Sequence, residues 1–423
     1  MQLGSQVTRR DVLAGAAATA MTGLMPRGSL QAADAVKPKS VAAIITAYEH
    51  GLHADVLCGK ILEGWKQDGG PGPALTLASM YVEQFTDRDM ARPMAAKHNV
   101  PLFETIEEAV TVGGDSIPVD GVLVIGEHGT YPYNEKGQHL YPRRRFFKGV
   151  TDAFVKYDTV VPVFSDKHPG PVWEDAKWIY DRAQELEIPF MAGSSLAVTF
   201  RNPSIDVPMG CAITGAVGIG YSGLDIYGIH ALEAFQSLVE RRHGAEQGVQ
   251  SVQCLQGDAM WEALDDGTVS RELFDAALAL VGNPSADLRA SATDGTALFL
   301  FQYVDGLVGA IFMLPGAAEK SAVALQIAGE SAPLATRFEE FPEPRHPHFA
   351  YLLKAIERMM HTGKPSYPVE RTILNAGILD RALTSRYENH RKLETPELAI
   401  AYTPVDYPHA PEPELSSDPR QPL

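Results

Sequence analysis

Two side chains of the sequence have types and positions that suit the transfer of a proton or a hydride. Lys167 follows a short apolar run, in the tetrapeptide DKHP. An ammonium group just past a buried strand can polarise a hydroxyl or carbonyl group. His230 lies at the start of a predicted helix, and imidazole suits proton transfer near neutral pH. Lys167 and His230 are therefore the predicted catalytic pair, the alternatives being an exposed loop lysine and a histidine satisfied by a neighbouring carbonyl.

A dense polar segment follows another apolar run. It opens with Glu127 and His128 and ends with three consecutive arginines, of which Arg143 and Arg144 are the first two. Charged residues directly after a buried strand are costly to place unless they are solvated or face a ligand. Glu127 and His128 suit an acid/base pair or metal ligands, and the arginines suit a carboxylate or phosphate. These four residues are the predicted substrate-binding set, the alternative being a solvated loop whose arginines pair with the many acidic residues.

The elements around these residues predict a parallel sheet. Apolar runs of strand length alternate with amphipathic stretches of helix length from residue 40 to 192, which is typical of a doubly wound, Rossmann-like fold. Ligands of such folds lie at the carboxyl ends of the strands. The predicted strands are Ser40–Thr46, Ala74–Val82, Val119–Ile125, Val160–Ser165 and Pro189–Ala192, and the helices between them are Ala54–Gln67, Asp89–His98, Arg143–Tyr157 and Glu174–Glu187.

Longer strand-like segments after about residue 200 predict a second, α+β domain with an antiparallel sheet and helices at one side. Ala297–Val304 and Leu307–Leu314 flank Asp305-Gly306, a strong hairpin signal. Helices are expected over Ile229–Arg241, His348–His361 and Glu370–Tyr387. The predicted organisation is a signal peptide (1–35), a dinucleotide-binding domain (36–200), a substrate and oligomerisation domain (201–395) and a Pro-rich tail (396–423) that wraps the surface or is disordered.

The loop after the first strand, Thr46–Gly51, stands where a dinucleotide site has G-x-G-x-x-G. Gly51 matches the third glycine alone, and Tyr48 stands where a side chain would obstruct the pyrophosphate. Glu83 follows the second strand, where an acid binds ribose, although nearby Arg88 would favour a 2′-phosphate. The predicted cofactor-binding residues are Thr46, Tyr48, Gly51, Glu83 and Gly126.

The chain resembles the Gfo/Idh/MocA family of oxidoreductases, over about residues 40–390. Similar segments follow the family's order: Ala91–Phe103 (ARPMAAKHNVPLF), the strand Val119–Ile125, Val160–Pro169 (VVPVFSDKHP) and Asn202-Pro203 at the entry to the second domain. The family's corresponding strand ends in Glu-Lys-Pro, so the present sequence carries an additional histidine. Gly223–His230 is similar to the family's D-x-G-x-H, with the acid one residue early.

The resemblance implies roles for these residues. The family's lysine lies by the nicotinamide and the substrate hydroxyl, which assigns that place to Lys167, and its histidine is the general base, which assigns that role to His230 with Asp225 as the third catalytic residue. It also implies NAD(P) as cofactor and a sugar-like or polyol substrate. An exported protein would hold this cofactor tightly, because free nicotinamide cofactor is scarce outside the cytoplasm. A homo-oligomer through the outer face of the second sheet, at Ala297–Leu314, is expected in addition.

The first 35 residues have the order of a twin-arginine export signal. Arg9 and Arg10 are followed by a weakly hydrophobic stretch, Ala14–Met25, and by small residues around Ala33 that suit cleavage. The alternative is a cytoplasmic N-terminus that contains Arg-Arg by chance. The twin-arginine machinery carries folded proteins, so the sequence predicts an exported, periplasmic protein loaded with its cofactor before export.

Composition excludes several classes of partner. The chain has 423 residues with 36 basic and 53 acidic side chains, a net charge of −17 that repels nucleic acid. No apolar run is long enough to span a membrane. Three scattered cysteines, Cys58, Cys211 and Cys254, make neither a disulfide framework nor a zinc site. Further histidines at 168, 346 and 348 do not have a spacing that demands a metal, and none is assigned.

Three functions remain open on the sequence. The leading hypothesis is an exported oxidoreductase that transfers hydride between NAD(P) and a sugar-like or polyol substrate. The first alternative keeps the fold but is an NAD-dependent glycosidase, or a cofactor-free hydrolase built on Glu127 and His128. The second is a non-catalytic, exported carbohydrate-binding or assembly protein, because a fold does not fix a function.

Overall fold

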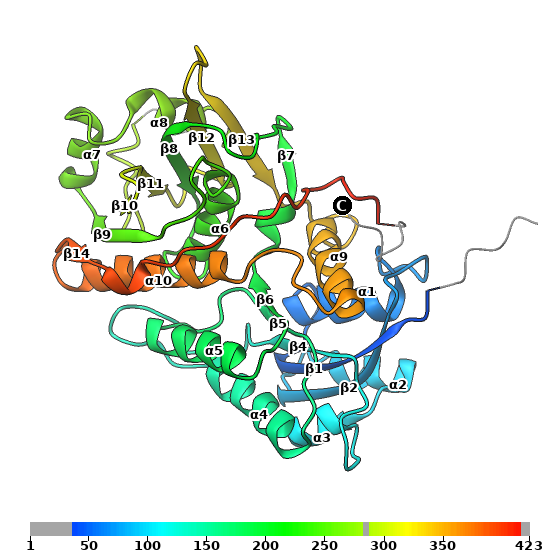
Figure 1. The fold of residues 1–423 in the computed structure, drawn as a ribbon. Coiled ribbons are helices and arrows are strands. Elements are labelled where there is room, and N and C mark those ends of the chain that lie inside the picture. Colours follow the sequence, from blue (N-terminus) through cyan, green and yellow to red (C-terminus); the bar gives the residue numbers. More distant parts are fainter. Residues whose placement is uncertain (1–35, 282–286, 416–423) are drawn as a thin grey trace, which may run out of the picture. The chain divides into compact units, whose positions relative to one another are not determined.

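The computed structural model describes residues 36–281 and 287–415, and the predicted export signal lies outside the described residues. The chain forms a six-stranded parallel sheet followed by an eight-stranded mixed sheet (Figure 1). The first sheet contains β1 (Lys39–Ala47), β2 (Leu75–Gln84), β3 (Leu102–Phe103), β4 (Gly121–Ile125), β5 (Val163–Asp166) and β6 (Phe190–Gly193). Its helices are α1 (His53–Glu63), α2 (Ala91–His98), α3 (Ile106–Thr111), α4 (Arg143–Lys156) and α5 (Trp173–Glu185). This sheet confirms the predicted Rossmann-like fold class.

The order of the first sheet, β3-β2-β1-β4-β5-β6, fixes where a ligand can bind. Strand β1 pairs in parallel with β2 on one side and with β4 on the other. The carboxyl ends of β1 and β4 therefore flank the point where the strand order reverses, which is the ligand edge of such sheets. The sheet is apolar on both faces because helices cover both. Successive residues of β1 face opposite sides of the sheet, so Val41 lies in one core cluster and Ile44 in another.

Helices α3, α4 and α5 pack on one face of this sheet, and α1 and α2 pack on the other. The second face is completed by α9 (Pro347–Thr362), which returns from far along the chain and packs against α1. Phe349 and Leu353 of α9 lie in the same core cluster as Ile45 of β1. Residues more than three hundred positions apart in the sequence thus meet at the ligand edge.

The second sheet has the order β14-β9-β10-β11-β8-β12-β13-β7. Its strands are β7 (Phe200–Asn202), β8 (Ile213–Gly220), β9 (Val249–Leu255), β10 (Ala297–Tyr303), β11 (Val308–Met313), β12 (Ala322–Ile327), β13 (Leu334–Glu339) and β14 (Leu393–Glu394). The predicted hairpin of β10 and β11 is confirmed. The sheet is mixed because β8 pairs in parallel with β11. Strand β8 was not predicted because glycines interrupt its apolar pattern. These glycines let α6 approach the strand: a Cβ at Gly218 would lie 3.2 Å from Phe235, and one at Gly220 would lie 2.9 Å from Ala231.

Helices cover both faces of the second sheet, where the sequence predicted one. Helices α6 (Gly228–Val239) and α10 (Glu370–Tyr387) pack on one face, and α7 (Asp258–Asp265) and α8 (Arg271–Leu278) pack on the other. On the latter face Phe312 of β11 stacks edge-on against Phe274 of α8, with ring centroids 4.7 Å apart. The chain's own helices thus cover part of the outer face at the hairpin where a homo-oligomer contact was expected.

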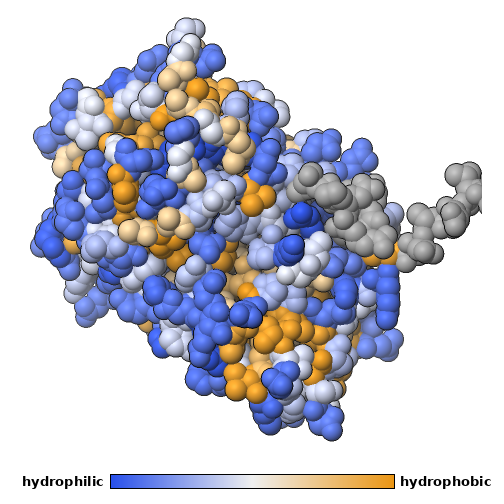
Figure 2. All heavy atoms as spheres, viewed as in Figure 1, coloured by the Kyte–Doolittle hydropathy of each residue, from blue (hydrophilic) through white to orange (hydrophobic). Residues whose placement is uncertain are grey.

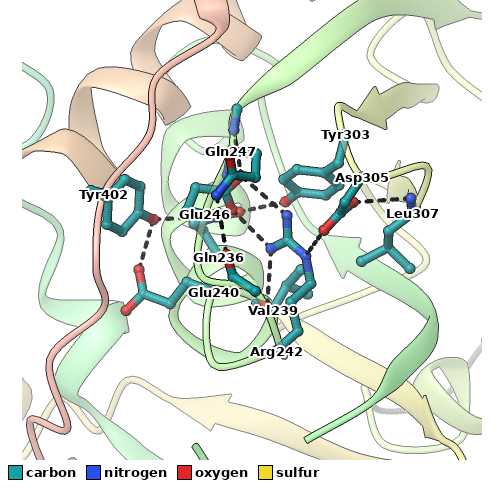
Figure 3. A network of polar contacts seen from close by, with 12 residues as sticks. Gln236, Val239, Glu240, Arg242, Glu246, Gln247, Tyr303, Asp305, Leu307 and Tyr402 are labelled. Atoms are coloured by element: carbon teal, nitrogen blue, oxygen red, sulfur yellow. Dashed lines mark hydrogen bonds and ion pairs between the residues drawn. The ribbon is translucent and has the colours of Figure 1, made fainter. Parts of the chain in front are cut away.

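A buried polar network fixes the C-terminal end of α6 (Figure 3). Arg242 donates to both carboxylate oxygens of Glu246, at 2.9 and 3.1 Å, and to Asp305 at 2.6 Å. Gln236 donates to Glu246 at 2.6 Å and to the Tyr402 hydroxyl at 3.0 Å. Tyr402 belongs to the segment after η2 (Pro396–Leu398), so the described part of the predicted tail wraps along the body.

No helix among the described residues is long and apolar enough to cross a bilayer. Figure 2 shows that hydrophilic residues cover most of the face drawn there, with apolar residues gathered towards its lower part. The three cysteines are free thiols.

Candidate functional site

A cavity of about 250 Å³ lies at the ligand edge of the first sheet. Its wall combines the loops after β1, β4 and β5 with the start of α6 and the start of α9. Five imidazoles line it, together with an ammonium, two phenols, a hydroxyl and a carboxyl group. The lining residues are Gly51, Leu52, His53, His128, Lys167, Ser195, Tyr221, Ile226, Tyr227, His230, Glu340, His346, His348 and Phe349.

Lys167 reaches the cavity from a buried ion network. Its Nζ lies 2.7 Å from Oε1 of Glu127, and Arg143 binds the other oxygen of that carboxylate. Arg143 also contacts Nε2 of His168 at 3.3 Å. Burial opposes ionisation of Glu127, but Lys167 and Arg143 outweigh it and hold the pKa of this carboxyl well below its ordinary value. Glu127 therefore stays a carboxylate that anchors two cations.

The backbone is held in an unfavourable conformation at three residues of the cavity wall, of which His346 (φ +51°) stands just before α9. His128 has φ +71° just after β4, and Lys167 has φ +59° just after β5. The left-handed region costs a residue with a Cβ about 1–2 kcal/mol. Backbone bonds between Lys167 and Gly193, at 3.0 and 3.2 Å, maintain this conformation. Strain of this kind clusters at functional sites, and here it turns the side chains of His128 and Lys167 into one cavity.

His53, the first residue of α1, links this helix to the end of β5. Its Nδ1 lies 2.6 Å from Oδ2 of Asp166, the last residue of β5. Its ring packs edge-on against His128 and Phe349, with centroid distances of 5.1 and 4.8 Å. A buried carboxylate thus fixes the orientation of this imidazole.

His230 enters the cavity from the first turn of α6. Its Nδ1 is hydrogen-bonded to the hydroxyl of Ser194, which also accepts from the amide of Leu196 at 3.1 Å. Burial, together with the nearby Lys167, places the pKa of His230 well below its ordinary value. The ring is therefore neutral and is held by a neutral partner.

Two further imidazoles of the cavity, His128 and His348, are neutral as well. Burial and the adjacent His53 lower the pKa of His128 to about 3, and burial and the adjacent His346 lower the pKa of His348 to about 3. Several buried polar atoms at and behind the cavity have no hydrogen-bond partner among the described residues. They are Nε2 of His128, Nε of Arg143, Oδ1 of Asp166, Nδ1 of His168, Oγ of Ser195, Oδ1 of Asp225 and Nδ1 of His348. Buried polar groups without partners are rare in proteins and indicate a place for a bound molecule or water.

The structure brings several of the predicted residues to this cavity. Lys167, His230, His128 and Gly51 line it. Glu127 and Arg143 stand directly behind Lys167, so they support the cavity and do not form its surface. Thr46 is fully buried, and its hydroxyl donates to the carbonyl of Glu127 at 2.6 Å. Gly126 supports the same cluster, because a Cβ there would lie 2.8 Å from the side chain of Arg143.

Four predicted residues lie apart from the cavity wall. Tyr48 does not obstruct the ligand edge as expected, because its ring packs into the core against α1. Glu83 accepts from the hydroxyl of Tyr131 at 2.7 Å and pairs with an arginine of α4. Arg144 turns to the surface, where it pairs with Asp175 of α5 at 2.9 Å.

Asp225, the fourth, precedes two residues of the wall and does not line it. Its Oδ2 accepts from the amide of His139 at 2.8 Å. Burial raises the pKa of this carboxyl to about 6, although the hydrogen bond from His139 acts in the opposite direction. Asp225 therefore ties the loop after β4 to the start of α6.

The sequence did not predict His53 and Asp166 as a pair, nor the following residues of the wall: Ser195, Tyr221, Tyr227, Glu340 and Phe349. The signal for the pair was faint: His53 is the residue before the first predicted helix, and Asp166 stands beside the predicted lysine in DKHP. His346 and His348 were noticed only as further histidines. Within residues 36–281 and 287–415, no group of three or more histidine, cysteine or acidic side chains is arranged to hold a metal ion.

Comparison with known proteins identifies the fold. No protein-family model matches the chain, and no curated protein matches it in sequence. Solved structures do match. GenD2 from gentamicin A biosynthesis, solved in complex with NAD, is 14% identical with a TM-score of 0.55, and the match covers 88% of this chain and 99% of that chain.

Two inositol dehydrogenases are similar to the same extent. Scyllo-inositol dehydrogenase from Lactobacillus casei, solved with NAD(H) and scyllo-inositol, is 12% identical with a TM-score of 0.52, over 85% of this chain and 99% of that chain. Myo-inositol 2-dehydrogenase from Lactobacillus plantarum is 12% identical with a TM-score of 0.51, over the same shares. The chain thus has the two-domain fold of Gfo/Idh/MocA-type dehydrogenases.

Proposed function

We propose that this protein is an oxidoreductase that transfers hydride between NAD(P) and a hydroxyl-bearing carbon of a sugar-like or polyol substrate. The observation that carries the proposal is the cavity itself, where Lys167 of the first sheet and His230 of α6 face one space. Similarity to GenD2 and to inositol dehydrogenases, which are crystallised with NAD or NAD(H), supports the same reaction class.

The chemistry of the wall favours an uncharged substrate with several hydroxyl groups. Lys167 is neutralised by Glu127, and the imidazoles of His128, His230 and His348 are neutral, so the wall offers many hydrogen-bonding groups and little net charge. Neutral imidazoles, phenols and hydroxyls both donate and accept hydrogen bonds, as a polyol does. Lys167 in this scheme donates to the reacting oxygen and polarises it.

The loop after β1 has room for a nucleotide despite its missing glycines. Gly51, at φ +73°, has no atom within 3.9 Å of the position of a Cβ, and Tyr48 is turned into the core. The amide of Gly51 already donates to Asp55, at 2.8 Å. Positive charge comes instead from Arg345, which contacts His50 and lies 3.4 Å from Asp55. Arg345 would therefore hold the phosphates, in the space that Gly51 leaves open, with Lys167 at the nicotinamide end. When bound, the cofactor accepts or supplies the hydride.

A cofactor-free hydrolase built on Glu127 and His128 is a weaker candidate. Both oxygens of Glu127 are bound by buried cations, so this carboxylate is not free to act as an acid, a base or a nucleophile. A glycosidase that uses bound NAD(P) places the same demands on Lys167 and remains a variant of the proposal.

Export and assembly complete the proposal. We propose that the twin-arginine segment directs the folded, cofactor-loaded protein to the periplasm. We propose in addition that copies associate through the part of the second sheet that α7 and α8 leave uncovered, where Val308 is 36% exposed at the start of β11. Size measurement in solution and cell fractionation test these two statements.

The experiment for the central proposal measures the cofactor and its reduction. Protein purified in folded form is denatured, and released nucleotide is identified by absorbance and mass spectrometry. Reduction of the bound or added cofactor is then followed with myo-inositol, scyllo-inositol and common aldoses. Lys167→Met is expected to lower kcat/KM about 100-fold or more, because the reacting oxygen loses its cationic partner.

Lys177→Met, which removes an exposed ammonium paired with Asp181 on α5, is the matched control and is expected to leave the rate unchanged. Absence of any nucleotide from the folded protein, together with no reduction of added NAD or NADP, contradicts the proposal.

A further inference from the structure

Of the five imidazoles that line the cavity, His53 alone contacts a carboxylate within the described part of the chain. Nδ1 of His53 lies 2.6 Å from Oδ2 of Asp166, whose side chain is 1% exposed. No hydrogen bond joins Nε2 of His53 to any residue that the structure describes. One ring nitrogen is thus held by a buried anion, and the other faces the cavity.

This arrangement differs from that of His230, the base that the sequence predicts. Nδ1 of His230 is held by the hydroxyl of Ser194, which carries no charge. An imidazole that takes up a proton becomes a cation, and a carboxylate at hydrogen-bond distance stabilises that cation while a hydroxyl does not. Lys167 also disfavours a positive charge on His230. Asp166 therefore makes His53 the better proton acceptor of the two.

We propose that His53, oriented and charge-compensated by Asp166, is the residue that exchanges a proton with the ligand bound in the cavity. The proposal rests on the proposed oxidoreductase function for the identity of that ligand. In the oxidation, the O–H bond of a substrate hydroxyl breaks and its proton moves to Nε2 of His53. The oxygen electron pair forms the carbonyl bond as hydride leaves the carbon for NAD(P)⁺. The substrate is oxidised by two electrons, the nicotinamide is reduced, and the proton stays on His53.

The position of the pair in the fold supports this role. His53 is the first residue of α1, and Asp166 is the last of β5, so both are fixed by regular elements at the ligand edge. Lys167 follows Asp166 directly and lines the same cavity. Oδ1 of Asp166 is buried without a partner, so nothing within the described residues competes for this carboxylate. Phe349 and His128 pack against the ring of His53 and restrict its rotation.

Several groups would tune the proton exchange. Asp166 and Glu127 favour the protonated ring, and the ammonium of Lys167 opposes it. The neutral rings of His128, His230, His346 and His348 complete the charged and titratable surroundings from β4, α6 and α9. Because the two carboxylates come from different strands, replacing Asp166 leaves the Glu127 network in place.

The test compares pH–rate profiles of kcat/KM for polyol oxidation. Asp166→Asn is expected to move the acidic limb of the profile to lower pH by about one unit or more, because an opposite charge next to the ring is lost. His53→Gln is expected to abolish that limb and to lower the rate about 100-fold or more. His230→Gln is expected to lower the rate while the limb keeps its position.

His98→Gln is the matched control. His98 lies 3.4 Å from the carboxylate of Glu63, away from the cavity, so its loss should leave rate and profile unchanged. An acidic limb that persists in His53→Gln, or that disappears in His230→Gln, overturns the proposal.

A second measurement does not depend on turnover. Nitrogen NMR of the histidine side chains in the full chain is expected to show several rings with the proton on Nδ1 near neutral pH, because His390 and His409 also donate from Nδ1 to carbonyl groups. One of these signals should be absent from His53→Gln and lose its fixed tautomer in Asp166→Asn. If no polyol is oxidised but the Nδ1 signal of His53 is present, the proposed function fails, while the pairing of His53 with Asp166 (the dyad) is supported. If His53 instead interconverts between tautomers, the dyad itself is refuted.

Discussion

Two buried polar networks of this protein differ in how completely they are paired. At the C-terminal end of α6, none of the side-chain atoms of Gln236, Arg242, Glu246, Tyr303 and Tyr402 is buried without a partner, within the described residues (Figure 3). At and behind the cavity, seven buried polar atoms have no partner there. Both networks contain a carboxylate bound by an arginine, so the difference does not lie in the type of residue.

The difference separates a structural network from one prepared for a ligand. A fully paired network stabilises one conformation, and unpaired buried groups lower stability until something binds them. The two networks share one helix: the paired network fixes the last turn of α6, and His230 stands in its first turn. The paired network at the last turn of α6 therefore fixes the helix that carries His230 into the cavity.

The largest expected effect comes from breaking the paired network. Arg242→Met leaves Glu246 buried without its arginine and is expected to lower the free energy of unfolding by about 3–5 kcal/mol. Urea denaturation measures this change, and the additional substitution Glu246→Gln should recover part of it. Lys148→Met, which breaks an exposed pair with Asp152, should cost at most about 0.5 kcal/mol. Equal costs for Arg242→Met and Lys148→Met would remove the distinction between the networks.

A smaller effect is expected from pH at the cavity. The pKa of His348 is about 3 in the folded chain and ordinarily about 6.5 when unfolded, so the unfolded chain binds the proton more readily. This stability is present above pH 6.5 and is lost as the pH falls towards 3. At pH 5 the loss amounts to about 2 kcal/mol.

The difference in unfolding free energy between pH 7 and pH 5 should therefore be about 2 kcal/mol smaller in His348→Gln than in the unmodified protein. Urea denaturation at the two pH values measures it, with His98→Gln as the control. An unchanged difference would show that His348 is protonated in the folded state.

The smallest expected effect has the opposite sign. The hydroxyl of Ser195 is buried in the cavity wall without a partner among the described residues. Ser195→Ala is expected to raise the free energy of unfolding by up to about 1 kcal/mol, because an unpaired polar group is removed. Thermal denaturation measures the gain, and the same variant should bind a polyol more weakly. A loss of stability would mean that the hydroxyl is paired in solution.

The sequence predicted five of the six strands of the first sheet because they are apolar runs between amphipathic helices, and it missed β3, which has only two residues. It missed β8, where glycines replace the apolar residues so that α6 can approach, and it placed helices on one face of the second sheet only. These differences depend on packing between distant segments, which no local pattern records.

The same limit applies to the site. Lys167 and His230 could be predicted, because each stands at the end of an element with a recognisable pattern. The partner of His53, Asp166, is 113 residues away, so the pair has no local signature. Arg143 and Arg144 are adjacent in sequence, but consecutive residues of a helix face different directions, and only Arg143 turns inward.

The return of α9 to the first sheet has a consequence for how the protein could be divided. The cavity takes His53 from near the start of the described chain, His230 from its middle and His348 from α9. A polypeptide cut between β6 and β8 would place half of the wall on each piece. Such a pair of fragments would therefore have to reassociate to be active, so their activity per mole would fall on dilution. The activity per mole of the intact chain would not depend on concentration.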